Sequence, residues 1–410
     1  MTKDYILFSM TTRIDRRSFL GAAGVGAVAL RVEATRLDDD PLGVRAEFPV
    51  TREQAYLNSA YVGPIPRSVR DAAVEEADAK MLMPTPGNRS DRSERAREKF
   101  ARLFGAKKEE IALLYSTSDG ENVVTAALDW KPGDNVVLDE LHFQTSFVLY
   151  RELEKAKGIE LRITPQSGGR APLEDFDSRI DARTRLVSVA WVSNRNGFRQ
   201  DLEGLSRLTH SKGALVYVDA IQALGTFETN LASTGADFLC SGAFKWLFGG
   251  FGVAPLYVRE EHLGRIRPDR YGHAQIVEEL PDFRFRMHES AKKYEYAALA
   301  YGAVFQLDAA LDFLGRVGLA RIEKHGLALA QELRERIASL GYETLTPPDN
   351  PSPIVAFVHG RDRKELEKRL EAEKVMVTFR EGGSQIRASV ALFNNRSDVE
   401  RLLGVLRAMA

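Results

Sequence analysis

Short apolar runs alternate with helical patterns through the middle of the chain. Seven runs between residues 111 and 258 are rich in Val, Ile and Leu and are bounded by Gly, Pro, Asp or Asn, which is typical of buried strands. They are Ile111–Tyr115, Asn135–Leu138, Leu161–Thr164, Leu186–Ala190, Leu215–Val218, Phe238–Cys240 and Val253–Val258. Helical patterns separate several of them, at Asn122–Trp130, Phe147–Ala156 and Leu202–Ser211. This alternation predicts an α/β fold with a mostly parallel sheet that helices cover on both faces.

The pattern changes after residue 291, where longer helical stretches begin. The elements expected there are helices at Tyr301–Leu314, Leu319–Leu340, Lys364–Glu373 and Asp398–Met409, and strands at Ile354–Val358, Val375–Thr378 and Ile386–Val390. We therefore predict four parts of the chain: a leader at 1–35, an N-terminal arm at 36–60, a large domain at 61–290 and a smaller α+β domain at 291–410.

Residues 1–35 have the pattern of a targeting segment. Arg16 and Arg17 stand before Ser-Phe-Leu and a short uncharged apolar run at 21–30, in which Ala27-Val28-Ala29 is a candidate cleavage site. The paired arginines resemble a twin-arginine signal, and the run is shorter than the roughly 20 residues that span a bilayer. This predicts export of the folded protein by the twin-arginine machinery to the periplasm or beyond the cell. An ordinary N-terminal helix on a cytoplasmic protein is the alternative.

Composition narrows the class of protein. The 410 residues include 57 Lys+Arg and 58 Asp+Glu, a formal net charge of -1, which argues against binding nucleic acid through bulk charge. Hydrophobic residues make up 44% of the chain, enough for a large core. The single cysteine excludes an intramolecular disulfide and a cysteine-cluster metal site, and we expect no metal. The composition favours a globular enzyme without a stable membrane span.

Lys245 lies in an unusual setting. It follows the strand that ends at Cys240 and precedes the glycine-rich turn 248–252, with apolar residues on both sides. Apolar surroundings lower the pKa of a lysine and make it a nucleophile able to form a Schiff base. A lysine whose stem lies along an apolar surface with its ammonium in water is the alternative.

Asp219 strengthens the chemical interpretation. It ends an apolar strand, at the carboxyl edge where open α/β sheets bind ligands, and precedes Lys245 by 26 positions (245 − 219), the length of one crossover. Pyridoxal phosphate needs this pair, a lysine for its aldehyde and a carboxylate for its pyridine nitrogen. Gln222, three residues after Asp219, would reach the ring oxygen. We expect this cofactor in the crevice between the two strand ends.

Residues 116–120, Ser-Thr-Ser-Asp-Gly, lie between a predicted strand and a predicted helix. Their hydroxyls and the free N–H groups at a helix N-terminus suit a phosphate. Taken alone, however, the segment favours an ordinary Ser/Thr/Asp cap of the helix over a phosphate site.

Five segments in this order resemble the class V aminotransferase family of fold-type I pyridoxal-phosphate enzymes: residues 116–122, 193–197, 219–223, 244–247 and 387–389. The sequence looks most similar to the isopenicillin N epimerase-like and cysteine desulfurase-like branches, and residues 56–60 and 63–66 are similar to their N-terminal active-site segment. The resemblance covers residues 47–408. It implies a fold-type I architecture and a homodimer, in which His273 and Glu295 fall in the interface segment; a surface loop and a helix start are the alternatives.

The resemblance also implies roles for single residues. Lys245 would form the aldimine with the cofactor and then move the α-proton, while Asp219 would pair with the pyridinium nitrogen. The cofactor-binding residues that it implies are Thr117, Ser118, Phe143, Asn194, Asp219, Gln222, Ser241 and Lys245.

For the substrate, an amino acid or a derivative of one, Arg387 would hold the α-carboxylate through its planar guanidinium. Asn58 and Ala60, in the N-terminal active-site segment, would line the same side.

Several positions depart from the family pattern. Phe244 stands where many members have a histidine, and Gly242 where a serine is common, with Ser241 one position away. The ring-stacking position aligns with Phe143, one residue from His142. Residues 391–394 lack the histidine that many members carry near the substrate arginine.

The desulfurase cysteine is absent. Residues 374–385, the segment before Arg387, contain no cysteine, and Cys240 falls on a core strand. We therefore expect a transaminase- or epimerase-type reaction rather than persulfide formation. A β-eliminating C–S or C–Se lyase is the alternative, and a non-catalytic ligand-binding protein of the same fold is an alternative of another class.

Overall fold

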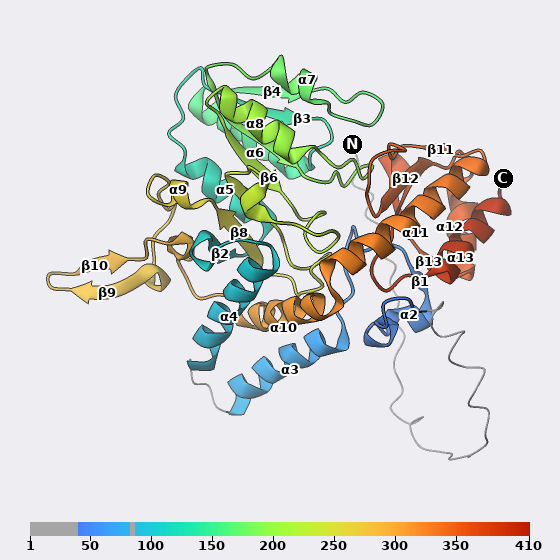
Figure 1. The fold of residues 1–410 in the computed structure, drawn as a ribbon, viewed down its shortest axis with the longest axis horizontal. Coiled ribbons are helices and arrows are strands. Elements are labelled where there is room, and N and C mark those ends of the chain that lie inside the picture. Colours follow the sequence, from blue (N-terminus) through green and yellow to red (C-terminus); the bar gives the residue numbers. More distant parts are fainter. Residues whose placement is uncertain (1–39, 83–86) are drawn as a thin grey trace.

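The computed structural model describes residues 40–82 and 87–410, which form a large body and a smaller one, and the consecutive helices α10 (Tyr301–Val317) and α11 (Leu319–Ser339) lead from one to the other (Figure 1). The predicted leader at 1–35, with its paired arginines, lies outside the described residues. Where the chain is described, no helix is long and apolar enough to cross a membrane.

A seven-stranded sheet forms the centre of the large body, in the order β2-β8-β7-β6-β5-β3-β4. Strand β8 is antiparallel to both of its neighbours and the other pairs are parallel. The strands are β2 (Ile111–Leu114), β3 (Asn135–Asp139), β4 (Glu160–Thr164), β5 (Thr184–Ala190), β6 (Leu215–Asp219), β7 (Phe238–Cys240) and β8 (Ala254–Val258). The predicted mostly parallel sheet is confirmed.

Helices cover both faces of this sheet (Figure 1). Val216 and Val218 of β6 belong to one hydrophobic cluster and Tyr217 to another, because successive strand residues point to opposite faces. The helices are α5 (Thr117–Ala127), α6 (Gln144–Lys157), α7 (Leu173–Asp177), α8 (Leu202–Ser211) and the short α9 (Glu260–Leu263). Residues from α5 and α6 pack in the Tyr217 cluster and residues from α8 in the other one.

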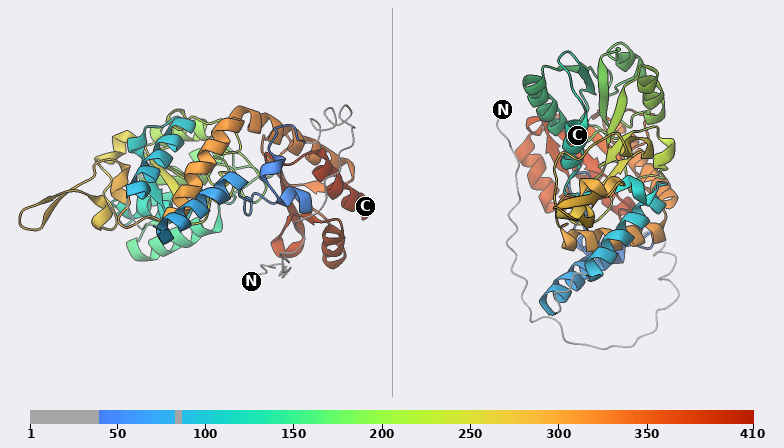
Figure 2. Two further views of the ribbon diagram at one scale, coloured as in Figure 1. Left: turned by 90° about the horizontal axis from the view of Figure 1, so that it is seen from below. Right: turned by 90° about the vertical axis from the view of Figure 1, so that its left-hand side faces the viewer.

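Three further helices pack together at the edge of the large body: α3 (Arg67–Leu82), α4 (Gly87–Leu103) and α10 (Tyr301–Val317). The buried carboxylate of Asp308 on α10 pairs with Arg92 at 2.9 Å and Lys99 at 2.6 Å, both on α4. A hairpin of β9 (Ile276–Leu280) and β10 (Arg284–Met287) projects away from this body (Figure 2).

The smaller body contains a four-stranded antiparallel sheet in the order β11-β12-β15-β14. Its strands are β11 (Glu343–Thr344), β12 (Ile354–Val358), β14 (Thr378–Arg380) and β15 (Gln385–Ser389). Its helices are α11 (Leu319–Ser339), α12 (Arg363–Ala372) and α13 (Arg396–Arg407). The predicted small domain began at residue 291, whereas α10 packs with α3 and α4 on the large body, so the smaller body consists of the N-terminal segment and the chain from α11 onward.

The N-terminal segment that precedes the large body contributes to this smaller one. After the short helix α2 (Val50–Glu53), strand β1 (Ala55–Tyr56) pairs in parallel with β13 (Val375–Met376), and Ala55 and Leu57 are fully buried in the C-terminal core.

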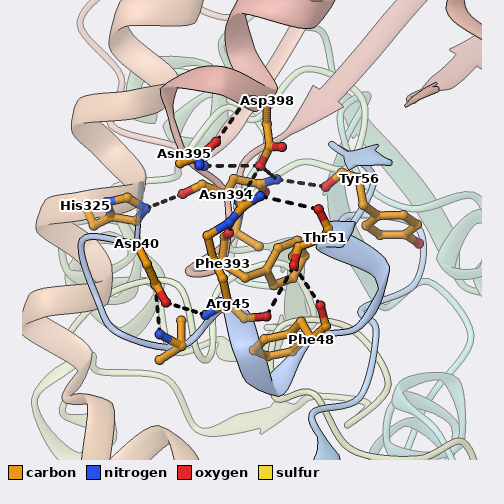
Figure 3. A network of polar contacts seen from close by, with 12 residues as sticks. Asp40, Arg45, Phe48, Thr51, Tyr56, His325, Phe393, Asn394, Asn395 and Asp398 are labelled. Atoms are coloured by element: carbon orange, nitrogen blue, oxygen red, sulfur yellow. Dashed lines mark hydrogen bonds and ion pairs between the residues drawn. The ribbon is translucent and has the colours of Figure 1, made fainter. Parts of the chain in front are cut away.

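A polar network fixes this segment (Figure 3). Arg45 donates to Phe393 O at 2.7 Å and to the Asp398 carboxylate at 2.9 Å. Asn394 donates to Tyr56 O at 3.1 Å and also contacts Asp398. The following residues, 58–60, are thereby held beside the end of β15.

At the amino edge of the large sheet, the buried carboxylate of Asp237 links two histidines. Its oxygens lie 2.8 Å from His210 Nε2 and 2.7 Å from His262 Nε2. Burial raises the pKa of Asp237, but the hydrogen bonds from His210, His262 and Val216 N together outweigh burial and hold that pKa at about 2. The same bond raises the pKa of His210 above its ordinary value.

We expect the His210–Asp237 contact to make stability depend on pH. Because the pKa of His210 is higher in the folded than in the unfolded chain, the contribution is complete below about pH 6.5 and is lost as pH rises through the folded pKa. Denaturant unfolding of the wild type and His210→Gln measures it: the difference in free energy of unfolding should shrink above neutral pH. A difference that stays constant from about pH 5.5 to about pH 8.5 would refute this assignment.

Candidate active site

Asp219 and Lys245 lie at the carboxyl edge of the large sheet. Asp219 is the last residue of β6, is buried, and accepts a hydrogen bond from Ile221 N at 3.0 Å. Lys245 follows β7 in a tight turn, in which Phe248 N donates to Lys245 O at 3.2 Å. Gly63 N donates to Phe244 O at 2.9 Å, and a Cβ on Gly63 would collide with Lys245 O. Only a glycine at position 63 therefore allows the N-terminal segment to pass this close to the backbone of Lys245.

The charges around Lys245 favour its neutral form. Burial, with the positive charges of Arg387 and Arg380, lowers the pKa of Lys245 to about 7, and Asp219 opposes this shift. Burial raises the pKa of Asp219, while the Ile221 amide and the Lys245 charge lower it. Near neutral pH a large fraction of Lys245 is therefore the free amine, which is the form that attacks an aldehyde.

Gln222 ties three segments of the site together. Its Nε2 donates to Ala60 O at 2.9 Å, and its Oε1 accepts from Trp246 Nε1 at 2.7 Å. Ala60 N donates to Ser389 Oγ at 2.9 Å, two residues after Arg387. Gln222 Nε2 carries a second N–H, and this group is available for the predicted contact with a ring oxygen.

The N-terminus of α5 lies against the segment before Lys245. Ser116 caps the helix by accepting from Asp119 N at 3.1 Å, and Thr117 Oγ1 accepts from Gly242 N at 2.9 Å. Thr117 and Ser118 are the first two residues of the helix, so their N–H groups have no partner within it. Ser241 Oγ is buried and has no hydrogen-bond partner among the described residues. These donors are arranged as a phosphate site requires.

His142 and Phe143 differ in how deeply they are buried. His142 is fully buried, its Nδ1 accepts from Phe143 N at 2.7 Å, and its Nε2 lies 3.1 Å from Ser188 Oγ. Burial lowers the pKa of His142 to about 3, so the ring is neutral. Phe143, at the start of α6, is half-buried. This arrangement suits Phe143 rather than His142 as the residue that stacks on a ring.

Arg387 is a buried cation on β15. Its exposed fraction is 2%, and it donates to Asn194 O at 2.8 Å and to Thr378 Oγ1 at 3.3 Å. Its Nε has no partner, and no carboxylate in the described part of the chain forms an ion pair with it. Burial, and then the charge of Arg380, lower the pKa of Arg387 to about 9. A buried guanidinium without a counter-ion is costly, so the site suits an anionic ligand.

Most of the residues expected from the sequence are linked by contacts in this crevice. Asn58, on the N-terminal segment, accepts a hydrogen bond from the Thr378 hydroxyl, which joins it to Arg387. Ser118 O accepts a hydrogen bond from Asn122 Nδ2 at 2.8 Å, and Phe143 N donates to His142 Nδ1. The structure adds Thr378 and Arg380, which lie outside the motif segments of the sequence analysis, and it shows the contacts of three residues inside those segments: Gly63, Trp246 and Ser389.

Comparison with known proteins identifies the family of the chain. The family model for aminotransferase class-V matches residues 56–402. The chain belongs to the class V aminotransferase family. It is a pyridoxal-phosphate-dependent enzyme.

The relatives of this class V enzyme include proteins named as desulfurases. A probable cysteine desulfurase of Methanothermobacter thermautotrophicus is 28% identical over 392 residues, 90% of this chain and 97% of that protein. Apo cysteine desulfurase from Thermococcus onnurineus NA1 superposes with a TM-score of 0.81 at 26% identity, over 90% and 98% of the two chains. The cystine C–S lyase C-DES, at 19% identity and a TM-score of 0.82 over 88% and 100%, shares the fold.

The residues of the class V enzyme fit its cofactor. Thr117, Ser118 and the unpartnered Ser241 hydroxyl would hold the phosphate, and Asp219 the pyridine nitrogen. When bound, pyridoxal phosphate supplies an electron sink for the bond that breaks at the α-carbon. Lys245 would hold the cofactor and, as a group with a pKa near 7, carry a proton to and from the substrate.

Proposed function

We propose that this enzyme transforms an amino acid at its α-carbon by a transaminase- or epimerase-type reaction, with the substrate carboxylate on Arg387. The observation that carries the proposal is the buried Arg387 guanidinium, which lacks a carboxylate partner among the described residues and acts electrostatically on Lys245. A carboxylate bound there supplies the missing counter-ion. It also places the α-carbon of the same molecule near the lysine that moves its proton.

A panel of amino acids tests this proposal. The holoenzyme is incubated with each L- and D-amino acid, with and without a keto acid, while the absorbance of the bound cofactor is followed. We expect at least one amino acid to change the spectrum and to give a keto acid or the opposite enantiomer. If the cofactor binds and no amino acid changes its spectrum, the non-catalytic ligand-binding alternative replaces this proposal.

A β-eliminating lyase is the second candidate, supported by the names of its relatives: probable cysteine desulfurase for one homologue and cystine C–S lyase for a protein of the same fold. In this reaction the bond between the β-carbon and the sulfur or selenium breaks, and that atom leaves in a free product. The same panel distinguishes it, because cysteine or cystine would then yield pyruvate together with sulfide or a small-molecule persulfide.

Neither candidate uses a protein thiol. Cys240 on β7 is fully buried, its Sγ lies 3.8 Å from Ser116 O, and a Cβ on Gly120 would come within 2.6 Å of that sulfur. Burial, and then the charge of Asp219, raise the pKa of this thiol well above its ordinary value. A protonated thiol inside the core is a poor nucleophile.

We expect Cys240→Ala to keep the turnover of whichever amino acid the panel identifies. Cyanide treatment of the wild type after incubation with cysteine should release no thiocyanate, because no persulfide forms on the chain. Loss of turnover in Cys240→Ala at unchanged cofactor content, together with thiocyanate from the wild type, would instead indicate a persulfide-forming desulfurase.

Export by the twin-arginine route is part of the proposal. An enzyme that folds around a cofactor before export needs a pathway for folded proteins, and Arg16-Arg17 match the signal of such a pathway. We expect replacement of both arginines by lysine to leave the protein in the cytosol, as measured by cell fractionation. Equal amounts outside the cytosol for both proteins would contradict a functional leader.

The proposed enzyme is a homodimer. The family resemblance supports this, and so do the apolar side chains that the single chain exposes on and near the β9–β10 hairpin, among them Phe283 at 94% and Tyr271 at 68% exposure. Light scattering of the holoenzyme should give twice the mass of one chain.

A further inference from the structure

A closed ring of buried polar side chains lies next to Phe143, the predicted ring-stacking residue. Glu121 of α5 accepts hydrogen bonds from Ser188 Oγ at 2.6 Å and from Ser146 Oγ at 2.7 Å. His142 contacts the same two serines, with its Nε2 3.1 Å from Ser188 Oγ and its Nδ1 3.4 Å from Ser146 Oγ. The four side chains are at most 4% exposed and lie on α5, on β5 and in or just before α6. A buried network of this kind is stable only where its donors meet acceptors.

The contacts determine the direction of the hydrogen bonds in this ring. Phe143 N, a backbone donor, lies 2.7 Å from His142 Nδ1, so Nδ1 is the acceptor and carries no proton. Because burial lowers the pKa of His142 to about 3, the imidazole is neutral and its single proton is on Nε2. His142 Nε2 therefore donates to Ser188, which donates to Glu121. Two hydrogen bonds in series connect Glu121 with the imidazole that holds the backbone of Phe143.

Glu121 is the acceptor at the end of this series. Burial raises the pKa of Glu121 to about 7, against the hydrogen bonds from Ser188 and Ser146, which lower it. An ionised carboxylate can only accept, so both serines donate to it above that pH. Below that pH the added proton must itself be donated to a neighbour, and the direction of the series is no longer imposed.

None of the catalytic or substrate-binding roles proposed for this enzyme uses Glu121, an ionisable group in the core one turn beyond the phosphate segment of α5. Phe143 precedes α6, and the position of its backbone determines where its ring lies. We infer that Glu121 is a positioning residue, which acts through Ser188 and His142 to hold Phe143 where its ring can stack on the cofactor. This role depends on the assignment of Phe143 and not on which reaction follows.

Other titratable groups also face Glu121. On α6, β6 and β7, burial raises the pKa values of Tyr150, Tyr217 and Cys240 well above their ordinary values, so these groups stay protonated near neutral pH. The charge of Asp219 on β6 raises the pKa of Glu121 further, and Asp219 is the same in every protein compared below. A pH dependence that differs between the wild type and Glu121→Gln therefore reports the ionisation of Glu121.

Glu121→Gln keeps the size of the side chain and replaces one acceptor by a donor. If the new NH₂ group faces Ser188, that hydroxyl must donate to His142 Nε2, and the imidazole proton moves to Nδ1, opposite Phe143 N–H. If the NH₂ group faces Ser146, that hydroxyl turns to His142 Nδ1 and competes with Phe143 N. Either orientation weakens the hydrogen bond that holds Phe143.

Binding of pyridoxamine phosphate to the apoenzyme measures this effect without turnover. The probe has the ring and the phosphate of the cofactor but no aldehyde, so it forms no covalent bond with the protein. At about pH 8.5 we expect Phe143→Leu to weaken binding about 2- to 10-fold, which corresponds to one aromatic contact, and Glu121→Gln to weaken it at least about 2-fold. In the Phe143→Leu background, Glu121→Gln should have no further effect. Glu110→Gln, which alters a buried carboxylate that accepts from two backbone N–H groups just before β2, should bind the probe like the wild type.

The pH dependence of binding distinguishes positioning from a general structural effect. Because Glu121 is ionised above its pKa of about 7, its contribution is complete well above that pH and is lost as pH falls through it. The wild type and Glu121→Gln should therefore bind the probe alike at about pH 5.5 and differ at about pH 8.5.

Three results would overturn the inference: wild-type affinity in Phe143→Leu, an equal loss from Glu121→Gln with and without Phe143, and a loss in Glu121→Gln that is the same at both pH values. Denaturant unfolding of each variant shows whether it folds. If Glu121→Gln does not fold, the wild type and Phe143→Leu are compared instead. The affinity of Phe143→Leu should then change less with pH near neutrality, and an equal change in both proteins would also contradict the role of Glu121.

Discussion

Lys245→Ala is expected to lose the Schiff-base absorbance of the cofactor and to lower turnover by at least about 10²–10⁴-fold, the range that a positioned proton carrier supplies. The variant lacks both the amine that holds the aldehyde and the group that moves the α-proton. The fold should survive, because the turn around Lys245 is held by backbone bonds from Gly63 to Phe244 and from Phe248 to Lys245. Absorbance spectra and initial rates measure the two effects.

Lys212→Ala is the matched control. Lys212 follows α8, and its Nζ contacts Asp177 at 2.9 Å on the surface, so its removal should change neither the spectrum nor the rate. Retention of the wild-type spectrum in Lys245→Ala would mean that another lysine holds the cofactor.

Arg387→Gln is expected to keep the cofactor spectrum and to weaken the binding of carboxylate substrates by about 30-fold or more, since truncating one partner of a buried charge pair costs about 2–5 kcal/mol. Glutamine retains a donor for Asn194 O but has no charge for a carboxylate. A second effect follows from the electrostatics. Because the Arg387 charge lowers the pKa of Lys245, the variant should have a higher lysine pKa, and its apoenzyme should react with pyridoxal phosphate optimally at higher pH.

Titration with substrate and the pH dependence of cofactor uptake measure these two effects. Arg369→Gln, which removes a surface partner of Glu365 on α12, controls for the loss of an arginine. If Arg387→Gln loses the cofactor together with the substrate, Arg387 belongs to the cofactor site and the assignment of the α-carboxylate is wrong.

The central sheet was predictable because its strands are apolar on both faces. Each of the seven predicted strands lies within two residues of an observed one, and α8 has the predicted bounds Leu202–Ser211. Helix α5 begins at Thr117 rather than Asn122, since Ser116 caps it and the proposed phosphate segment forms its first turn.

Other elements give weak patterns. Helix α4 was missed because its buried face includes Arg97, which lies between the buried Ala96 and Phe100 and is neutralised by Glu295 at 2.5 Å. An ion pair between residues 198 positions apart is invisible to a periodicity argument. The β9–β10 hairpin is largely exposed and so lacks the alternation of a half-buried strand.

The candidate site likewise contains residues that the sequence predicts and residues that it does not. Lys245, Asp219 and Arg387 were predicted from the sequence, because strand ends and family motifs mark them, and the structure places Asp219 and Lys245 at the same edge of the large sheet. The sequence aligns the ring-stacking position with Phe143, one residue from His142, and the full burial of His142 favours the same choice, which stays a prediction. Arg380 carries no signal in the sequence, and its position depends on the antiparallel register that sets Thr378 opposite Arg387.

Proton exchange at the α-carbon tests the central claim most directly, because transamination, epimerisation and β-elimination all begin by removing that proton. The holoenzyme is mixed in D₂O with the amino acid that changes its spectrum, and the α-proton is followed by NMR. The proposed function predicts that the α-proton is lost or replaced by deuterium with the wild type and retained with Lys245→Ala. An amino acid that changes the cofactor spectrum while its α-proton stays in place would contradict it.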